Sequence, residues 1–406
     1  MYAIALSRCK IINMFKLAEK NNKEMWTLFL VVFMDLLGFG LILPLLPFIA
    51  ERFGGNEFQI GLLAATYSFF QFIAAPILGK LSDKYGRKKL LIISQIGSGI
   101  GFLLLGFANS LTLLFISRII DGITGGNISI AQAYVADITD KENRSKGMGI
   151  VGAAFGLGFI VGPAMGGLLS KYSFSLPAFV ATGMALLTAL ATFLFLEETV
   201  KTNKIKLKIR EVFGGQKDWY RIISEQGLMV LTLSFLALNL AQGLMQGMFP
   251  LWAERSIGYG PENIGWFFAY IGILSIIIQL KVLPWFTKMI GEVSTLKLAT
   301  VSRGLGLFAI PLVMDPKILV AVIPLFSLGG MANPTLQALV SEKVDEKEYG
   351  KTLGVVQSSG SLGRILGPII GGQLFFQFGA QVPFWLSASL MIAIALWMHK
   401  SIKKVS

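Results

Sequence analysis

The chain has 406 residues, of which 54% are hydrophobic and only 15% are charged, whereas soluble proteins average roughly 25% charged residues. Its net charge of +13 is divided among short segments between long apolar runs, which excludes a nucleic-acid-binding domain with one clustered basic face. A single cysteine and a single histidine exclude a disulfide framework and a cysteine-based metal site, so the composition predicts a polytopic membrane protein without metal or cofactor.

Apolar runs of about 20 residues are long enough to cross a bilayer as helices. We expect twelve such spans, near residues 25–50, 59–79, 89–108, 111–136, 147–169, 176–196, 228–252, 263–283, 295–314, 317–341, 351–376 and 381–399. The side that carries both termini receives 29 of the 36 Lys and Arg residues, the other side receives 4, and 3 lie within spans. Because positive charge gathers in cytoplasmic loops, both termini are expected in the cytoplasm and the protein in the plasma (inner) membrane.

Two stretches of 19 residues, 149–167 and 354–372, match at an offset of 205 and share nine identical positions. A self-similar offset of about half the length indicates a duplicated unit. The expected organisation is a basic leader at 1–24, a six-span unit at 25–196, a polar linker at 197–227 and a second six-span unit at 228–406. The leader is not a signal peptide, because basic residues interrupt every apolar run in it.

The first of these stretches carries Gly158, Gly162 and Gly166, which recur every four residues and therefore lie on one helix face. Small residues at this spacing allow two membrane helices to approach to backbone contact. Pro163 removes one backbone donor and permits a kink. Since the pattern occurs twice at one offset, it predicts two close-packed, bendable helices rather than incidental packing.

The first span carries Asp35, about 15 Å into the membrane if the helix starts near Met25. A carboxylate at this depth costs about 2.5–3.5 kcal/mol to insert, so it marks a functional site or a structural ion pair. Arg118 and Asp121 lie three residues apart in the fourth span, on one face, and a mutual pair is expected. We expect Asp35, Arg118 and Asp121 to take part in proton coupling.

The cytoplasmic loop between the second and third spans contains two glycines, one acid and a basic cluster at Gly79, Asp83, Gly86 and Arg87. Anchoring by positive charge would explain the basic residues, but neither the acid nor the glycine spacing. The loop resembles the signature of the major facilitator superfamily, in which it forms a latch between two halves. The resemblance implies that Asp83 sits at the start of the eleventh span, where a helix dipole favours an anion, and that Asp137 joins the latch.

The stretch at 149–167 then resembles the superfamily's antiporter motif, at Gly158, Gly162, Pro163, Gly166 and Gly167. This resemblance is closest to the branch of tetracycline exporters, a group of drug:proton antiporters. It implies an all-α membrane protein of the major facilitator fold, with twelve transmembrane helices in two six-helix bundles related by a pseudo-two-fold axis. Where the tetracycline exporters carry two acids and a histidine, this chain has Gly101, Arg303 and Ser275, so tetracycline itself is not the expected substrate.

The resemblance also implies that spans one, four, seven and ten line the central cavity. Polar residues there could contact substrate or could bond between helices, and both readings stay open. These candidates are Asn127, Asn239, Gln242, Gln246, Asn333 and Gln337, together with Gln357 and Arg364 of the eleventh span. Arg364 replaces Phe159 of the first repeat, so its charge is not needed for packing. Arg303, in a span of a peripheral class, is expected to snorkel or to form a structural pair.

The sequence contains no P-loop, no HExxH and no G-x-S-x-G, so it predicts neither an ATP motor nor an enzyme. The expected function is proton-coupled export of a small amphiphilic molecule or drug by a monomer in the lipid bilayer. The partners are therefore protons and a small-molecule substrate, and no nucleic acid. A same-fold transporter of a metabolite, siderophore or lipid is one alternative, and a non-transporting membrane receptor or scaffold is the other.

Overall fold

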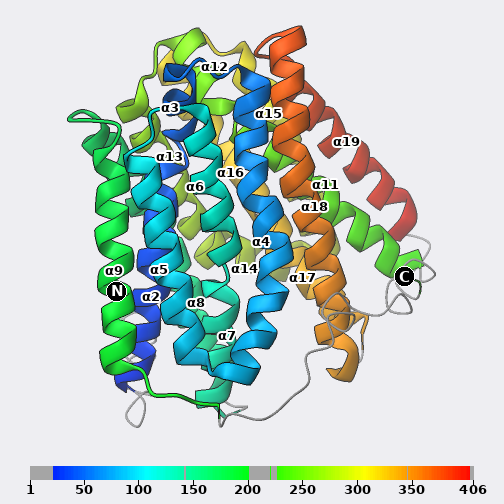
Figure 1. Cartoon of the computed structure of the whole chain (residues 1–406). Coiled ribbons are helices and arrows are strands. Elements are labelled where there is room, and N and C mark those ends of the chain that lie inside the picture. The colour runs from blue at the N-terminus through cyan, green and yellow to red at the C-terminus, as the bar shows by residue number, and fades with distance from the viewer. Residues whose placement is uncertain (1–21, 141–142, 201–219, 221–225, 345, 403–406) are drawn as a thin grey trace, which may run out of the picture.

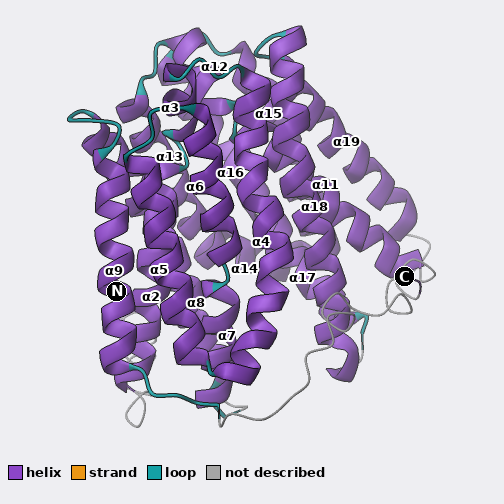
Figure 2. Cartoon of the chain, in the orientation of Figure 1, coloured by secondary structure: helices purple, strands orange, loops and turns teal. Residues whose placement is uncertain are grey.

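A computed structural model describes residues 22–140, 143–200, 220, 226–344 and 346–402. Regular structure in this part of the chain is helical throughout, as Figure 2 shows. Most of the expected leader (1–24) and most of the expected linker (197–227) fall outside the described residues. The helices run side by side as one elongated bundle (Figure 1).

The chain order of the helices follows the expected spans. The first half contains α2 (Asn22–Ile42), α3 (Leu46–Arg52), α4 (Glu57–Tyr85), α5 (Arg87–Gly106), α6 (Leu111–Thr124), α7 (Asn127–Ile138), α8 (Arg144–Ser170) and α9 (Leu176–Phe195). The second half contains α11 (Gln226–Gln246), α12 (Phe249–Ile257), α13 (Pro261–Ile277), η2 (Ile278–Val282), α14 (Leu283–Ile290), α15 (Glu292–Ala309), η3 (Ile310–Leu312), α16 (Pro316–Leu328), η4 (Gly329–Met331), α17 (Ala332–Glu342), α18 (Glu346–Phe378) and α19 (Val382–Ile402). Ten helical stretches among the described residues are long and apolar enough to cross a membrane. Helices α18 and α19 lie where the eleventh and twelfth spans are expected.

The duplicated glycine stretches pack in the same way in the two halves. On α8, a Cβ at Gly162 would lie 2.8 Å from the Leu37 carbonyl oxygen of α2. On α18, a Cβ at Gly367 would lie 2.7 Å from the Leu240 carbonyl oxygen of α11. Each half therefore contains one helix pair in backbone contact, as the glycine spacing predicts.

The two halves also meet through glycines, along two further helix pairs. Helix α4 packs against α18, and α8 packs against α13. Gly167 faces Gly265, and a Cβ at Gly167 would lie 3.1 Å from the Gly265 Cα. Gly61 and Gly372 face each other in the same way, with 3.2 Å between a Gly61 Cβ and the Gly372 Cα. The glycines of α8 and α18 therefore serve both the contacts within each half and the contacts between the halves.

One crossing in each half is interrupted at the same repeat position. The stretch Leu111–Ile138 breaks at Gly125 and Gly126, between α6 and α7. The stretch Pro316–Glu342 tightens into the 3₁₀ turn η4, at Gly329–Met331. Residues 125 and 330 are separated by the repeat offset of 205. An interrupted helix exposes backbone groups at membrane depth, and such backbone is tolerated where it is buried in protein or lines a cavity.

Candidate functional site

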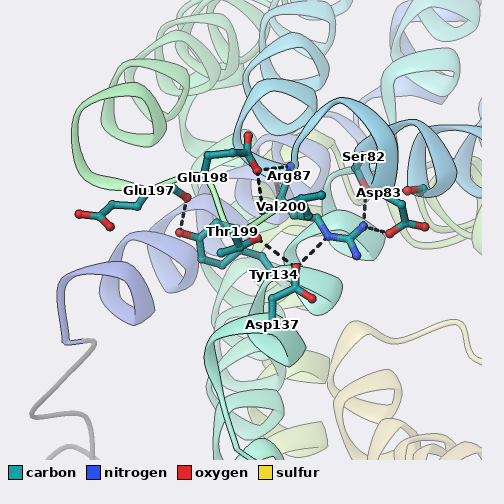
Figure 3. Close-up of polar contacts among 10 residues, drawn as sticks. Ser82, Asp83, Arg87, Tyr134, Asp137, Glu197, Glu198, Thr199 and Val200 are labelled. Carbon is teal, nitrogen blue, oxygen red and sulfur yellow. Dashed lines mark hydrogen bonds and ion pairs between the residues drawn. The ribbon is translucent and has the colours of Figure 1, made fainter. Parts of the chain in front are cut away.

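A tight turn between α4 and α5 positions Arg87. Gly86 has a φ of +110°, a conformation that favours glycine, and the Glu198 carboxylate occupies the space that a Cβ would need. The Arg87 backbone N–H donates to Glu198 over 2.7 Å, at the start of α5 where a helix dipole favours a carboxylate (Figure 3). The glycine thus allows the chain to turn and the acid to approach.

The Arg87 side chain connects three elements (Figure 3). Its Nη1 lies 2.5 Å from Asp83 and donates to Ser82 over 2.6 Å, and its Nε lies 3.1 Å from Asp137. Thr199 also donates to Asp137, over 3.0 Å. We call Asp83, Arg87 and Asp137 the latch cluster, and the end of the molecule that contains it the latch end.

These latch contacts all join parts of the first half. Asp137 contacts Arg87, which is the contact that the resemblance implies. The expected contact of Asp83 with the start of the eleventh span stays a prediction, because the side chains of residues 345–351 lie outside the described part of the structure. Glu198 and Thr199 were not predicted, since they follow α9 and approach the turn only in the folded chain.

At the opposite end of the molecule, ion pairs join the two halves. Arg255 of α12 bonds to Glu51 of α3 and to Glu57 of α4, each over 2.6 Å. Lys171 after α8 pairs with Glu262 of α13 over 2.7 Å. These far-end ion pairs lie beside the glycine contacts of α4 with α18 and of α8 with α13, so the halves are held together at this end.

Asp35 of α2 meets the interrupted crossing of the first half. The Asn127 side-chain amide, at the first residue of α7, donates to the Asp35 carboxylate over 2.7 Å. The side-chain carbonyl oxygen of Asn127, Oδ1, is buried and has no hydrogen-bond partner in the described structure. Asn127 was a candidate for substrate contact or for a bond between helices, and its amide bonds to the acid that we expect to carry the proton.

Two further side chains stabilise the break. The Gln71 amide of α4 donates to the Gly125 carbonyl oxygen over 3.0 Å and to the Tyr67 hydroxyl over 2.8 Å. This bond satisfies a carbonyl that the interruption removes from the helix ladder. Tyr67 and Gln71 were not predicted, because a tyrosine and a glutamine one turn apart are common in any helix.

Arg118 and Asp121 form the expected pair on α6. Their side chains are 3.2 Å apart, and each is nearly completely buried. Ser98 of α5 also hydrogen-bonds to Asp121. The described partner of Asp35 is Asn127 rather than Arg118, so any modulation of Asp35 by Arg118 would require a change of partners.

The second half presents Arg364 toward the first half. The Arg364 guanidinium donates to Asn239 over 2.9 Å and to Ser361 over 2.8 Å. Arg364 lies one turn before Pro368 on α18, and the Pro368 backbone faces Gly61 of α4. Tyr67 of α4 is a neighbour that affects the Arg364 guanidinium electrostatically. The other predicted cavity residues are half-buried: Gln242, Gln246, Asn333, Gln337 and Gln357.

The expectation for Arg303 was wrong. Arg303 is 8% exposed and therefore does not snorkel to a membrane surface. Within the described residues it forms no ion pair, and its Nε has no hydrogen-bond partner. The guanidinium lies 5.5 Å from the centre of the Phe326 ring, and the side chain packs against Gly329. The pattern of this span alone does not show which neighbour faces the arginine, whereas the repeat offset pairs Phe326 with Asp121 of the first half.

Comparison with known proteins agrees with this architecture. The sequence model that describes the Major Facilitator Superfamily matches residues 28–330 and 304–403 of this chain. The chain belongs to the Major Facilitator Superfamily. It is therefore a membrane transporter of the secondary type and not an enzyme.

Relatives of this superfamily member cover nearly the whole chain. It is 29% identical to the class H tetracycline resistance protein of Pasteurella multocida, over 90% of this chain and 91% of that protein. It is 28% identical to multidrug resistance protein 1 of Bacillus subtilis, over 93% and 96%. A crystal structure of a peptide transporter in complex with sulfate aligns with a TM-score of 0.78 at 15% identity, covering 95% of this chain and 96% of that one. The last similarity shows the fold alone.

Proposed function

We propose that this transporter is a proton-coupled antiporter that exports a small amphiphilic molecule by alternating access. The observation that carries the proposal is the position of Asp35, which bonds to Asn127 at the interrupted crossing of the first half. An intramembrane acid next to non-helical backbone is the arrangement that ion-coupled transporters use. The printed names of the relatives, tetracycline resistance and multidrug resistance, favour export of drug-like molecules.

Aromatic side chains beside Asp35 support an amphiphilic substrate. Phe39 lies one turn after Asp35 on α2, and its ring contacts those of Tyr67 and Phe159 at 5.3 and 6.0 Å between centres. Phe155 continues this row at 5.1 Å from Phe159. A molecule with an apolar ring and a polar group could stack on this row and direct its polar group toward Asp35 or Tyr67.

A cation on the other side of the interface would orient the substrate. Arg364 replaces the aromatic Phe159 of the repeat and bonds to Asn239, itself a candidate for substrate contact, so we propose that it favours anionic or carbonyl-bearing substrates. The bias of Lys and Arg favours a cytoplasmic position for the latch end and for both termini. The far-end ion pairs would then close the transporter to the outside, and a single chain would contain the complete site.

The experiment is a compound screen in inside-out membrane vesicles that contain the transporter. A fluorescent dye reports a pre-formed pH gradient, and candidate compounds are added one at a time. We expect partial collapse of the gradient with a compound that enters the vesicles, and no collapse with vesicles lacking the protein. Accumulation of such a compound that persists after the pH gradient is dissipated would contradict proton coupling.

A further inference from the structure

We propose that Arg303 forms an anion site in the second half, where its guanidinium binds one free halide or one carboxylate group. This site is separate from the proposed exchange of protons and substrate at Asp35. It involves α15 and the tightened turn η4, whereas Asp35 lies on α2 of the first half.

The first argument is the burial of an unpaired charge. Arg303 is 8% exposed, has no ion-pair partner among the described residues, and has an Nε without a hydrogen bond. Burial of a guanidinium without a counter-charge is strongly unfavourable, and buried charges in proteins are normally paired. The neighbouring Phe326 ring supplies a cation–π contact but no negative charge.

The second argument comes from the internal repeat. At the offset of 205, Arg303 corresponds to Ser98, and Phe326 corresponds to Asp121. The packing confirms this correspondence: a Cβ at Gly101 would meet Asp121 at 3.0 Å, and one at the equivalent Gly306 would meet Phe326 at 2.7 Å. In the first half this position therefore holds a carboxylate next to a serine. In the second half it holds an arginine, and the carboxylate that could neutralise it is replaced by a ring.

The third argument is the chemistry around the guanidinium. Gly329 of η4 faces the Arg303 side chain, whose Nε has no hydrogen-bond partner in the described structure. The Ser327 hydroxyl, at the end of the neighbouring helix α16, is also buried without a partner there, and it is a second donor on this side of the half. A hydroxyl and a guanidinium can both donate to an anion. A singly charged anion would neutralise Arg303 and would accept a hydrogen bond from its Nε, to which no protein group in the described residues bonds.

The test measures equilibrium binding of radioactive chloride, and separately of radioactive acetate, to the purified transporter in lipid nanodiscs. We expect saturable binding, with one site fewer per chain in Arg303→Gln than in the unaltered protein. Chloride binding identifies a free halide as the ligand, and binding of acetate alone identifies a carboxylate. Arg52→Gln is the matched control, because the Arg52 guanidinium also lies over a phenylalanine ring but is exposed, so its removal should leave the stoichiometry unchanged.

A second variant distinguishes loss of the anion site from misfolding of Arg303→Gln. Phe326→Asp supplies an internal carboxylate at the position that Asp121 occupies in the first half, and it should abolish the same binding site while keeping the arginine. Absence of saturable binding of either anion to the unaltered protein would overturn the proposal. Equal stoichiometry in the unaltered protein, Arg303→Gln and Phe326→Asp would overturn it as well.

Discussion

The Asn127 side-chain amide donates a hydrogen bond of 2.7 Å to the Asp35 carboxylate, across 92 residues of sequence. The bond links α2 to the first residue of α7, where the fourth crossing restarts after Gly125 and Gly126. A movement of α2 relative to the α6–α7 break would therefore change the environment of the acid directly.

Removal of this amide should impair coupling. A hydrogen bond to a charged group contributes about 1.5–3 kcal/mol, so Asn127→Ala should lower pH-driven transport on the order of tenfold. Initial rates in vesicles under an imposed pH gradient measure this effect. Ser129→Ala is the matched control, because Ser129 is an exposed residue on the same helix. Equal rates for Asn127→Ala and the control would show that the bond has no role in transport.

The glycine faces should be intolerant of large side chains. Gly162→Leu would force a side chain against the Leu37 carbonyl of α2, and overpacking typically costs about 1–3 kcal/mol. We expect a lower thermal unfolding midpoint and strongly reduced transport. Gly152→Leu on the same helix has no neighbour within 4 Å of a Cβ and should behave like the unaltered protein. A normal midpoint for Gly162→Leu would contradict the observed packing.

The latch cluster depends on the shape of the Arg87 guanidinium. Arg87→Lys retains the charge but cannot bond to Asp83, Ser82 and Asp137 together. We expect a loss of about 1–3 kcal/mol of stability, since at least one of these charge-assisted bonds is lost. Thermal unfolding of the purified protein measures it, and Lys89→Arg, at an exposed position of α5, is the control. An unchanged midpoint for Arg87→Lys would mean that the cluster contributes nothing to the fold.

The far-end contact should weaken as the pH rises. Burial, and secondly the charge of Glu51, raise the pKa of Glu254 above its ordinary 4.5. A raised carboxyl pKa means that the folded protein stabilises the neutral form of Glu254 relative to its charged form. The contact should therefore be strongest below the shifted pKa and weaken as the pH rises through it, when charged Glu254 repels Glu51 beside Arg255.

Spin labels can follow this end of the molecule. Tyr172→Cys and Asn263→Cys place labels on exposed residues of the two halves, in a Cys9→Ser background. We expect the distance distribution to shift toward longer values from pH 5 to pH 8, and Glu254→Gln to remove the shift. A distribution that changes equally with pH in Glu254→Gln would assign the effect to another group.

Much of the fold could be predicted because the relevant signals are local or periodic. Apolar length predicts the spans, and the spacing of Gly158, Gly162 and Gly166 predicts contact with another helix. The bias of basic residues predicts on which side of the membrane each loop lies, and that orientation stays a prediction. The partner helix could not be read from the sequence, since any neighbouring backbone would satisfy the same glycine face.

The polar site could be predicted only in part, for a related physical reason. The depth of Asp35 within the first span is enough to identify it as a candidate functional acid. A spacing of three residues predicts the Arg118–Asp121 pair, which the structure contains. Asn127 was a candidate for substrate contact because nothing local connects it to Asp35. The repeat offset was the signal that could have revealed the unusual position of Arg303, through the replacement of Asp121 by Phe326.

The most direct test of proton-coupled antiport is net transport by Asp35→Asn under an imposed pH gradient. Asparagine has a similar shape and can still bond to Asn127, but it cannot carry a proton. With a compound that the unaltered protein exports, we expect Asp35→Asn to bind it and to exchange it across the membrane at equal concentrations, but not to accumulate it when only a pH difference drives transport. Accumulation against a concentration gradient by Asp35→Asn, at the rate of the unaltered protein, would contradict the account.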